Sequence, residues 1–576
     1  MAAAELKAAN QDSKDSKALI KGHAANEIFF AVVGPVGAGS SHVARQLERR
    51  LKDTVYNGSK FSCEILKAGD VIGDWVKANK IELPHDPLDK KIAMQTYGDT
   101  MRKADHAAIA LRLVEKIAET RAKSQNKAYV RGQVVAPDGN PRAYILDSLK
   151  HPAEARILQK LYGDAFILIG VVCSEPVRKK RLLNAFFTGI DQGKAANKQK
   201  VDEFMARDSD DRDNKFGQHV TDVFQEADFF VDNTAKVTAP NGEMKDAIDL
   251  RLLSELDRLV SIITHRSVLR PTIDETAMHV AHTAKLQSSC LSRQVGASLV
   301  DSLGSIVATG TNEVPRAGGG VYGDGAGGPN VENRCALCEN AHCSNNEFQN
   351  KIIEDALVAL YGSDLSEEDR STKLERLRKT RLGGLLEFSR SVHAEMDALL
   401  SAARSGTSPV ASRLFVTTFP CHYCARHIVS AGVYEVQYIE AYPKSEALSL
   451  HGDAIATVPE VWIPPSEVPL AVKVVEEHKA RARLEAGVEN NREEVAMPVP
   501  VIRVGEMDGK VGKVLFRPFV GIAPKLYGRV FLKDREYKNK VTGKLEMGEA
   551  EWGSPWSLHQ LSYAALEASL TSDSAL

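Results

Sequence analysis

The sequence has no uninterrupted apolar segment of membrane-spanning length and no surplus of one charge. Although 43% of its 576 residues are hydrophobic, none of the runs approaches the ~20 apolar residues that a spanning helix needs. Lys and Arg number 74 and Asp and Glu 76, a formal net charge of -2, which argues against a broad basic surface for nucleic acid. Aromatic residues make up only 6%, which disfavours a base-stacking surface for single strands. These absences favour a soluble protein that acts on a small molecule.

The first 26 residues also lack the apolar core of a secretory signal peptide. They are rich in Ala, Lys and Ser, and we expect a flexible tail over residues 1–26. Five of the eight cysteines fall in two tight groups, Cys335 with Cys338 and Cys343, and Cys421 with Cys424. Such spacing in a large chain without a leader indicates metal binding in a reducing compartment. The sequence therefore predicts a cytoplasmic location.

The length predicts two or three domains, and strand-like and helix-like segments alternate in the first of them. We expect an α/β fold here, a parallel sheet with helices on both faces over residues 27–262, resembling P-loop NTPases of the nucleotide-kinase branch. The strand-like runs are Glu27–Val33, Ala143–Leu146, Phe166–Val172 and Asp228–Val231, and the clearest helical stretches are Ser41–Leu51 and His106–Lys123.

Between the first strand and helix, Gly34 to Ser41 has the spacing of a phosphate-binding loop. The loop lacks one residue of that motif, because Ser40 stands where a Lys normally reaches the outer phosphates, whereas Ser41 keeps the hydroxyl that meets magnesium. We expect regulatory binding of ATP or GTP with Mg²⁺ rather than phosphoryl transfer. The nucleotide-binding candidates are Gly34, Gly37, Gly39, Ser40 and Ser41. Arg178 and Arg181 are either lid arginines or a charged helix face.

A second α/β domain is predicted over residues 267–560. A helix over Asp274–Leu286 precedes a hairpin formed by Gln294–Val300 and Ser305–Thr309. A helical insertion is expected near residues 340–385, and strand-like composition returns at Val501–Leu532.

The segment His393-Ala394-Glu395, followed by Pro420-Cys421-His422-Tyr423-Cys424, matches the pattern H-x-E and P-C-x-x-C. Zinc prefers nitrogen and sulfur ligands, and three protein ligands leave a fourth position for water. The predicted ligands are His393, Cys421 and Cys424. Zinc lowers the pKa of bound water and so supplies a nucleophile for C4 of cytosine. Glu395 is the predicted catalytic residue, which carries protons between water, ring nitrogen and departing ammonia.

Two alternatives to a small-molecule deaminase remain open at this point. One is a non-enzymatic nucleotide sensor with a structural zinc, which has no need of the Glu395 carboxylate. The other is a deaminase acting on single-stranded nucleic acid, which the charge balance and low aromatic content disfavour. A helix over Ser391–Arg404 would place His393 and Glu395 near its start, and a second helix would begin at the cysteines, where its dipole stabilises thiolate.

Together with the zinc motifs, the stretches Ser289–Ala297 and Thr309–Arg316 resemble the deoxycytidylate deaminase family. The resemblance implies a three-layer α/β/α cytidine-deaminase-like fold with zinc at two helix N-termini, and a homo-oligomer. It also implies that Asn312 contacts sugar or base and that the Ala394 backbone contacts the base. For Asn312 the alternative is a residue that holds a turn.

Arg293 and Arg316 are candidates for the substrate phosphates, because a guanidinium fork matches phosphate oxygens. A solvated surface role is the alternative for each. The other cysteine group, Cys335, Cys338 and Cys343 with His342 or Cys290, predicts either a second zinc site or free thiols. Resemblance to phage-type deoxycytidylate deaminases favours the zinc site.

The order of the two predicted domains resembles the two-domain bacterial anti-phage deaminases. That resemblance implies zinc-dependent hydrolytic deamination of dCTP, with dCMP as a further candidate, to deoxyuridine nucleotides and ammonia. Depletion of dCTP would starve phage replication. The choice between dCTP and dCMP is not readable from the sequence.

Overall fold

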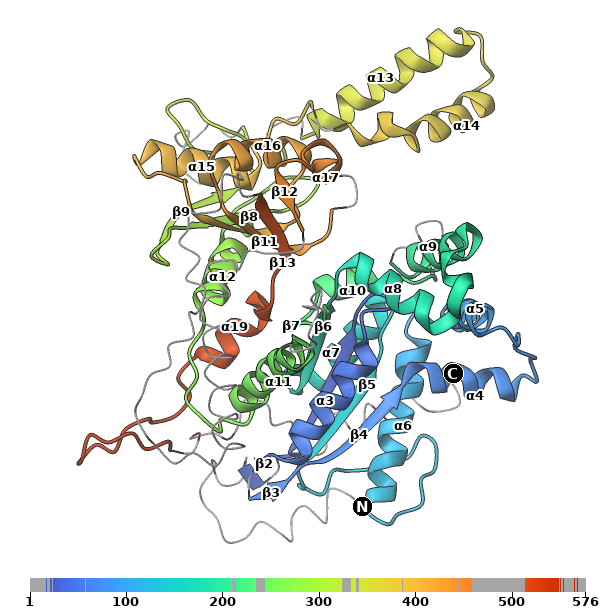
Figure 1. Cartoon of the computed structure of the whole chain (residues 1–576), viewed down its shortest axis with the longest axis vertical. Coiled ribbons are helices and arrows are strands. Elements are labelled where there is room, and N and C mark those ends of the chain that lie inside the picture. Colours follow the sequence, from blue (N-terminus) through green and yellow to red (C-terminus); the bar gives the residue numbers. More distant parts are fainter. Residues whose placement is uncertain are drawn as a thin grey trace. The chain divides into compact units, whose positions relative to one another are not determined.

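The computed structural model of the chain contains two compact units, Met1–Pro271 with Val520–Leu576, and Thr272–Phe519 (Figure 1). None of the described helices is long and apolar enough to cross a membrane. The structure describes residues 17, 21–22, 24–56, 58–209, 211, 214–234, 244–323, 333–337, 341–385, 387–442, 445–457, 513–548, 550, 553, 564 and 567.

The first unit is built on a six-stranded sheet with the order β14-β7-β6-β1-β5-β4. Five neighbouring strands are parallel, which confirms the predicted parallel sheet, and β14 runs antiparallel to β7. Every residue of β1 and β6 is buried, as expected for strands covered on both faces. The strands are β1 (Glu27–Val33), β4 (Ser62–Lys67), β5 (Arg142–Asp147), β6 (Phe166–Val172), β7 (Phe229–Asp232) and β14 (Gly521–Ile522).

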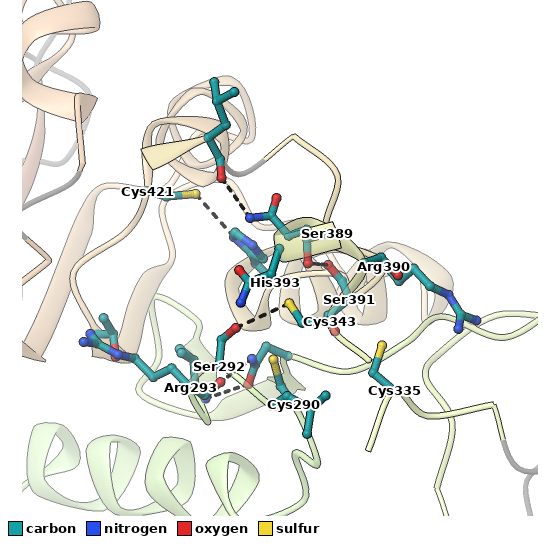
Figure 2. Close-up of a pocket in the computed structure, with 18 of the residues that line it drawn as sticks. Cys290, Ser292, Arg293, Cys335, Cys343, Ser389, Arg390, Ser391, His393 and Cys421 are labelled. Atoms are coloured by element: carbon teal, nitrogen blue, oxygen red, sulfur yellow. Dashed lines mark hydrogen bonds between the residues drawn. The ribbon is translucent and has the colours of Figure 1, made fainter. Parts of the chain in front are cut away.

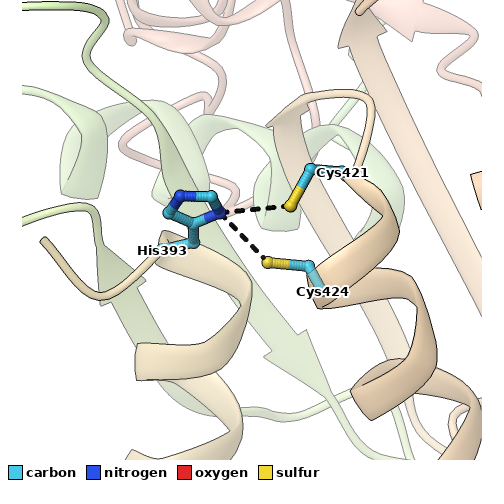
Figure 3. Close-up of side chains that lie close together, drawn as sticks. All are labelled: His393, Cys421 and Cys424. Carbon is cyan, nitrogen blue, oxygen red and sulfur yellow. Dashed lines mark hydrogen bonds between the residues drawn. The ribbon is translucent and has the colours of Figure 1, made fainter. Parts of the chain in front are cut away.

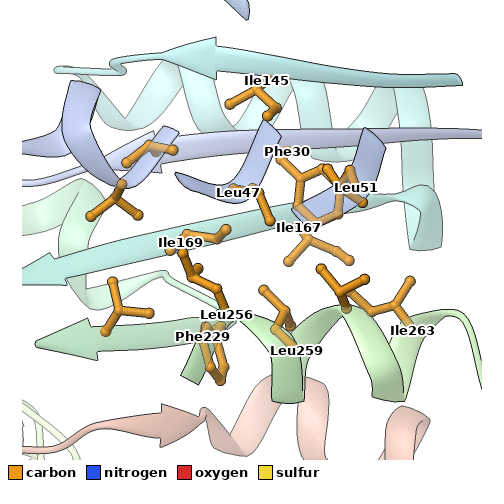
Figure 4. Packing of buried hydrophobic residues seen from close by; sticks show 14 of the residues in the cluster. Phe30, Leu47, Leu51, Ile145, Ile167, Ile169, Phe229, Leu256, Leu259 and Ile263 are labelled. Atoms are coloured by element: carbon orange, nitrogen blue, oxygen red, sulfur yellow. The ribbon is translucent and has the colours of Figure 1, made fainter. Parts of the chain in front are cut away.

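Successive residues of β1 point to opposite faces of this sheet. Phe30 packs with Leu47 of α3 (Ser40–Lys52) and Leu256 of α11 (Met244–Ile263) on one face (Figure 4). Phe29 faces the other way and stacks on Tyr162 of α7 with 3.6 Å between ring centroids. That second face is covered by α6 (Ala108–Ser124) and α7 (Pro152–Tyr162).

Smaller elements complete the first unit. Helices α5, α8 and α9 share a separate apolar cluster that includes Leu88, Leu182 and Phe204. The elements are β2 (Val55–Tyr56), β3 (Ser59–Lys60), α4 (Ala68–Ala78), α5 (Pro87–Ala104), η1 (Gly163–Ala165), α8 (Glu175–Phe186), η2 (Gly189–Gly193), α9 (Ala195–Ser209) and α10 (Val220–Gln225).

The boundary predicted at residue 560 differs from the structure, because the chain returns to the first unit at Val520. Ile522 of β14 pairs with Phe229 of β7, and Ile522, Leu526 and Phe531 are buried in the core beneath α3 and α11. Residues of Val501–Leu532 also form helix α19 (Pro524–Phe531) and not only strands. This return is a pairing between residues almost 300 positions apart, which no local pattern reveals.

The second unit contains a mixed six-stranded sheet with the order β12-β13-β11-β10-β8-β9. Strand β8 is antiparallel to both β9 and β10, whereas β10, β11, β13 and β12 are mutually parallel. The strands are β8 (Gly296–Val300), β9 (Ile306–Thr311), β10 (Arg413–Thr418), β11 (Glu435–Glu440), β12 (Ile455–Ala456) and β13 (Val514–Pro518).

Two glycines show that helices cover both faces of the second sheet. A Cβ at Gly296 would overlap the backbone of α12 (Ile273–Lys285), and a Cβ at Gly310 would overlap the backbone of α15 (Ala394–Arg404). Gly310 pairs with Ala297, the neighbour of Gly296, so the two glycines point to opposite faces. Helices α16 (His422–Ser430) and α17 (Ala447–Leu450) follow β10 and β11 in the chain. The unit therefore has three layers.

The segment predicted as a helical insertion forms α13 (Ser344–Tyr361), α14 (Glu367–Arg378) and the 3₁₀ turn η3 (Arg381–Gly384). Arg378 of α14 donates to Asn350 of α13 at 3.2 Å, and Arg370 pairs with Glu354. Several predictions fall outside the described residues: most of the tail over residues 1–26, the cluster residue Cys338, and nearly all positions from 549 to 560.

Candidate metal centre and active site

Three soft donor atoms converge where two helices of the second unit begin. His393 is the N-cap of α15, Cys421 is the N-cap of α16, and Cys424 lies one turn further along α16. The Nδ1 atom of His393 lies 3.3 Å from Sγ of Cys421 and 3.4 Å from Sγ of Cys424 (Figure 3). All three donors lie within 4.8 Å of one another. The structure thus brings together the three predicted zinc ligands.

Local pairing explains where the helices start. The helix predicted from Ser391 begins three residues later, at Ala394, because Val392 is extended and bridges to Glu313. Strand β10 ends at Thr418, and Pro420, which cannot donate to a ladder, precedes the start of α16. As a result, His393 and Cys421 occupy N-cap positions, where the backbone is extended and the end of the helix dipole is positive.

The donor set is one that zinc prefers, two sulfurs and an imidazole nitrogen. A hydrogen bond with Cys424, and next one with His393, lowers the pKa of Cys421 to about 4. The hydrogen bond with Cys421 and burial both raise the pKa of Cys424, and the hydrogen bond with Cys421 raises the pKa of His393 to about 9. A cation bound here would replace these shared protons and hold both sulfurs as thiolates. The residues present therefore fit a zinc ion with one open position.

Glu395 lies in the first turn of α15 and is 4% exposed. Burial raises the pKa of its carboxyl to about 7. Among the described residues the metal-donor group contains His393, Cys421 and Cys424 but not Glu395. The carboxyl group instead lines the adjoining pocket, where it can exchange protons with a bound molecule.

The pocket next to these donors has a volume of about 360 Å³, within the size range of small-molecule sites. Figure 2 shows residues that line it, with His393 and Cys421 among them. Of the predicted residues, Arg293, Asn312, His393, Glu395 and Cys421 line this pocket. Sequence reasoning missed other lining residues, which include Asn345, Gln349, Ser389, Arg390, Ser391, Thr418, Phe419 and Tyr442.

Asn312 holds the loop that carries Arg293. Its Oδ1 accepts from the backbone N–H of Val295 at 2.6 Å, and its Nδ2 donates to the Arg293 carbonyl at 2.6 Å. The amide keeps a second N–H and a second lone pair for another partner. The turn-holding alternative for Asn312 is therefore present in the structure, and it leaves room for a substrate contact.

The two arginines proposed for phosphate lie in different places. Arg293 lies over the Tyr442 ring at 5.8 Å, is 3.7 Å from Glu440, and lines the pocket. Arg316 is exposed in a turn, donates to the Gly319 carbonyl at 3.1 Å, and does not line the pocket. Ala394 is also absent from the pocket wall, because it is buried against Gly310.

The second cysteine group lies at the same pocket. Cys290, Cys335 and Cys343 line it (Figure 2), whereas His342 contacts Glu347 at 3.1 Å. Cys338 is outside the described residues, and within the described part of the chain no three of these side chains bring metal-donor atoms together. A second zinc therefore stays a prediction.

Some of the missed residues lie at the start of the helical insertion or just after its end, whereas Thr418, Phe419 and Tyr442 lie at the ends of β10 and β11. The amide of Asn345, at the start of α13, donates to the Leu385 carbonyl at 2.8 Å, which joins the two ends. Arg390 stands only three residues before His393 in the sequence. Proximity to the H-x-E motif was a signal for Arg390, as proximity to the P-C-x-x-C motif was for Phe419, whereas the positions of Asn345 and Gln349 depend on how the insertion folds.

In the first unit, the predicted phosphate loop connects β1 to α3. Gly37 and Gly39 have φ angles of 83° and 85°, a region that L side chains rarely adopt, and Gly39 is the N-cap of α3. Ser40 is the first residue of the helix, and the hydroxyl of Ser41 donates to Asp147 at 2.6 Å. Gly34 lies at the end of β1. The five predicted residues therefore form one strand-to-helix loop.

Comparison with known proteins decides the family of the second unit. The family model described as "Cytidine and deoxycytidylate deaminase zinc-binding region" matches residues 271–440. The deoxycytidylate deaminase of Enterobacteria phage T2 is 30% identical over 177 residues, which cover 30% of this chain and 81% of that relative. The chain belongs to the deoxycytidylate deaminase family.

Two further matches accompany this assignment. The deoxycytidylate deaminase of Enterobacteria phage T4 is 29% identical over 177 residues, covering 30% of the chain and 79% of the relative. The apo crystal structure of dCMP deaminase from the cyanophage S-TIM5 has 24% identity and covers 32% of this chain and 95% of that one, with a TM-score of 0.19. In this deoxycytidylate deaminase family member, the matched residues 271–440 include His393, Glu395, Cys421 and Cys424.

Proposed function

We propose that the protein hydrolytically deaminates deoxycytidine nucleotides, with dCTP as the principal substrate and dCMP as a further one. The observation that carries the proposal is the convergence of His393, Cys421 and Cys424 beside the buried Glu395 in one pocket. The products are the corresponding deoxyuridine nucleotide and ammonia.

When bound by His393, Cys421 and Cys424, zinc would lower the pKa of the attacking water and make it a nucleophile at neutral pH. Glu395 accepts a proton from that water and delivers it to the N3 atom of cytosine, which makes C4 electrophilic. The water oxygen bonds to C4, and Glu395 then carries the second proton of that oxygen to N4, so that the C4–N4 bond breaks, ammonia leaves and C4 keeps a carbonyl oxygen. Burial supports this role, because a carboxyl with a pKa near neutrality can both accept and donate.

The charges of the pocket support a phosphorylated substrate. Arg293 and Arg390 both line the pocket, and guanidinium groups match phosphate oxygens. The deoxycytidine moiety is supported by the relatives from phages T2 and T4, which are named deoxycytidylate deaminases. Support for dCTP over dCMP comes from the resemblance of the two-domain order to anti-phage deaminases.

The test is ammonia release and product mass from zinc-loaded, full-length protein offered dCTP, dCDP, dCMP, CTP, cytidine and a cytosine-containing oligonucleotide separately. Fastest turnover of dCTP is the expected result. Turnover of the oligonucleotide alone would overturn the proposal in favour of a nucleic-acid deaminase.

The matched control is Glu395→Gln, which keeps the shape of the side chain and removes the proton-transfer group. We expect kcat to fall by about 10²–10⁴-fold, while metal analysis finds zinc still bound. Full activity of this variant would refute the assigned role of Glu395.

We also propose that the first unit binds ATP or GTP with Mg²⁺ at the loop between β1 and α3, as a sensor and not as a kinase. Protein purified free of nucleotide should bind ATP or GTP in calorimetry without converting either to ADP or GDP. We further propose a cytoplasmic location, which cell fractionation tests, and a homo-oligomer, which light scattering of purified protein tests.

A defence role is the last part of the proposal, and it rests on the same resemblance to anti-phage deaminases. Cells that produce the wild-type protein should lose dCTP after phage infection and restrict phage growth, as measured by nucleotide pools and plaque counts. Glu395→Gln should abolish both effects, and restriction by that variant would overturn the proposed depletion mechanism.

A further inference from the structure

The loop between β1 and α3 turns its carbonyl groups toward one set of side chains. Arg178 donates to the Val36 carbonyl at 3.3 Å, and Arg181 donates to the carbonyls of Gly37 at 3.3 Å and Ala38 at 3.2 Å. In a planar trans peptide, the following N–H points the opposite way. The N–H groups of Gly37 and Gly39 therefore face the other side, and within the described part of the chain they have no hydrogen-bond partner.

A carboxylate from the same unit already accepts a hydrogen bond from a backbone N–H of this loop. Oδ2 of Asp208, the penultimate residue of α9, accepts from the backbone N–H of Val36 at 2.6 Å. Its Oδ1 accepts from Nζ of Lys150 at 2.9 Å, and Lys150 also donates to the Gly34 carbonyl at 3.2 Å. Asp208 is only 1% exposed. An internal anion is thus bound at the predicted phosphate loop.

Lys150 supplies a positive charge to the loop, whose own residues Gly34 to Ser41 include no lysine. The motif's Lys is replaced by Ser40, which is the first residue of α3. Lys150 instead follows β5, three residues after Asp147, whose carboxylate accepts from Ser41. Its ammonium group reaches the first glycine of the loop. A lysine from a neighbouring strand can therefore serve a phosphate at this position.

Three cationic side chains, Lys150, Arg178 and Arg181, donate hydrogen bonds to carbonyls of the loop. Asp208 accepts from Lys150, and Asp147 accepts from Ser41. Arg178 is 8% exposed, and its Nε atom is buried without a hydrogen-bond partner among the described residues. No ion pair of the described residues includes Arg178 or Arg181. Buried charges in proteins are normally paired, so the unpaired Nε leaves a positive charge beside the loop that an anion would stabilise.

We propose that the loop Gly34–Gly39 is a nucleotide-phosphate site that Asp208 keeps closed and in which Lys150 replaces the missing motif lysine. The inference rests on the nucleotide binding proposed above. Phosphate oxygens compete with Asp208 for the Val36 N–H and for the Lys150 ammonium group. Binding therefore releases Asp208, and with it the end of α9, from the loop.

The experiment measures calorimetric affinity of the full-length protein for ATP, GTP and tripolyphosphate. Asp208→Ala should bind at least about tenfold more tightly than wild type, because it removes the competing charged hydrogen bonds. Lys150→Met should bind at least about tenfold more weakly. The matched control is Asp202→Asn, on the same helix, whose ion pair with Lys179 at 2.6 Å is exposed to solvent; its affinity should equal that of wild type.

The outcomes separate the inference from the nucleotide binding on which it rests. If neither wild type nor Asp208→Ala binds any probe, both are overturned. If both bind with equal affinity, nucleotide binding stands and closure by Asp208 is overturned. Unchanged affinity in Lys150→Met would overturn the role of Lys150, and binding of nucleotides without tripolyphosphate would overturn a phosphate-directed site.

A second measurement does not depend on how well Asp208→Ala folds. Asp208→Asn removes the charge with almost no change of shape and should show the same direction of effect. In wild-type protein, saturating nucleotide should speed amide hydrogen exchange at the end of α9, near residues 205–209. Unchanged or slower exchange there would overturn the release of Asp208.

Discussion

The two units place helix N-termini beside ligand sites in opposite ways. In the second unit the N-caps of α15 and α16 are His393 and Cys421, whose side chains supply donors for a cation. In the first unit the N-cap of α3 is Gly39, which has no side chain and leaves backbone N–H groups for the phosphate that we propose binds there. Both sites lie at the positive end of a helix dipole, which would stabilise thiolates in one and the proposed phosphate in the other. The residue at the N-cap therefore decides which charge the site binds.

The sites also differ in what fills them. The pocket beside the metal donors has a volume of about 360 Å³ and is open to a substrate. The loop of the first unit is already occupied by the Asp208 carboxylate. A ligand enters the first of these sites directly, whereas it must displace part of the protein to enter the second. Substitutions in one site should therefore leave ligand binding at the other unchanged.

The largest effect is expected from Cys421→Ser. Loss of one of three ligands should remove zinc and reduce deamination to background, because a hydroxyl is a poor ligand in a thiolate site. ATP or GTP binding at the first unit should persist. Metal analysis, ammonia release and calorimetry on one preparation measure all three properties.

The control for this substitution is Cys63→Ala, a buried cysteine of the first unit whose pKa burial raises to about 12. It should keep both zinc and activity. Zinc retained at wild-type affinity in Cys421→Ser would refute the ligand assignment.

Two glycine substitutions, one near each site, should each destabilise the protein but weaken ligand binding only at the nearby site. In Gly310→Ala the new Cβ overlaps the Ala394 carbonyl, so α15 must shift and carry His393 with it. We expect a loss of about 1–3 kcal/mol in folding free energy and weaker zinc binding. In Gly39→Ala the new residue must adopt a left-handed φ of 85°, and its Cβ overlaps the side chain of Asn233. It should weaken nucleotide binding, cost about 1–2 kcal/mol, and leave zinc affinity unchanged.

Calorimetric melting and zinc titration measure this pair. Gly323→Ala serves as the control, because no atom lies within 4 Å of its added Cβ, and it should change neither property. Weaker zinc binding in Gly39→Ala would contradict the independence of the two sites.

The smallest expected effect is a pH dependence of the stability of the first unit, caused by Glu255, which contacts the end of β7. Glu255 of α11 accepts from the backbone N–H of Asp232, which precedes the loop contact Asn233, and burial raises the pKa of Glu255 to about 7. The unfolded carboxyl titrates near ~4.3. As pH rises from about 4 to about 7, the unfolded state loses this proton first, so the free energy of unfolding of the first unit decreases over this range.

Glu255→Gln removes this titration and should raise the melting temperature relative to wild type more at pH 8 than at pH 5, by about 2 °C or more. Asp257→Asn on the same helix is the control. An equal difference at both pH values would show that Glu255 does not titrate in this window.

Much of the chemistry of the second unit could be predicted from local patterns. The H-x-E and P-C-x-x-C motifs identify His393, Cys421 and Cys424, because chemistry fixes both residue type and spacing. The phosphate-binding role of Arg316 stays a prediction, because its side chain lies in an exposed turn outside the residues that line the pocket.

The sequence by itself determined the donor set of the metal centre, the glycine loop, and the alternation that produces a parallel sheet. These follow from residue type at short spacing, which is a local property. Only the tertiary structure decided that Ile522 completes the first core, that Arg390 and Asn345 line the substrate pocket, and that Asp208 and Lys150 meet at the glycine loop. Each depends on contacts between distant segments, and which of many such contacts form is set by packing of the whole unit.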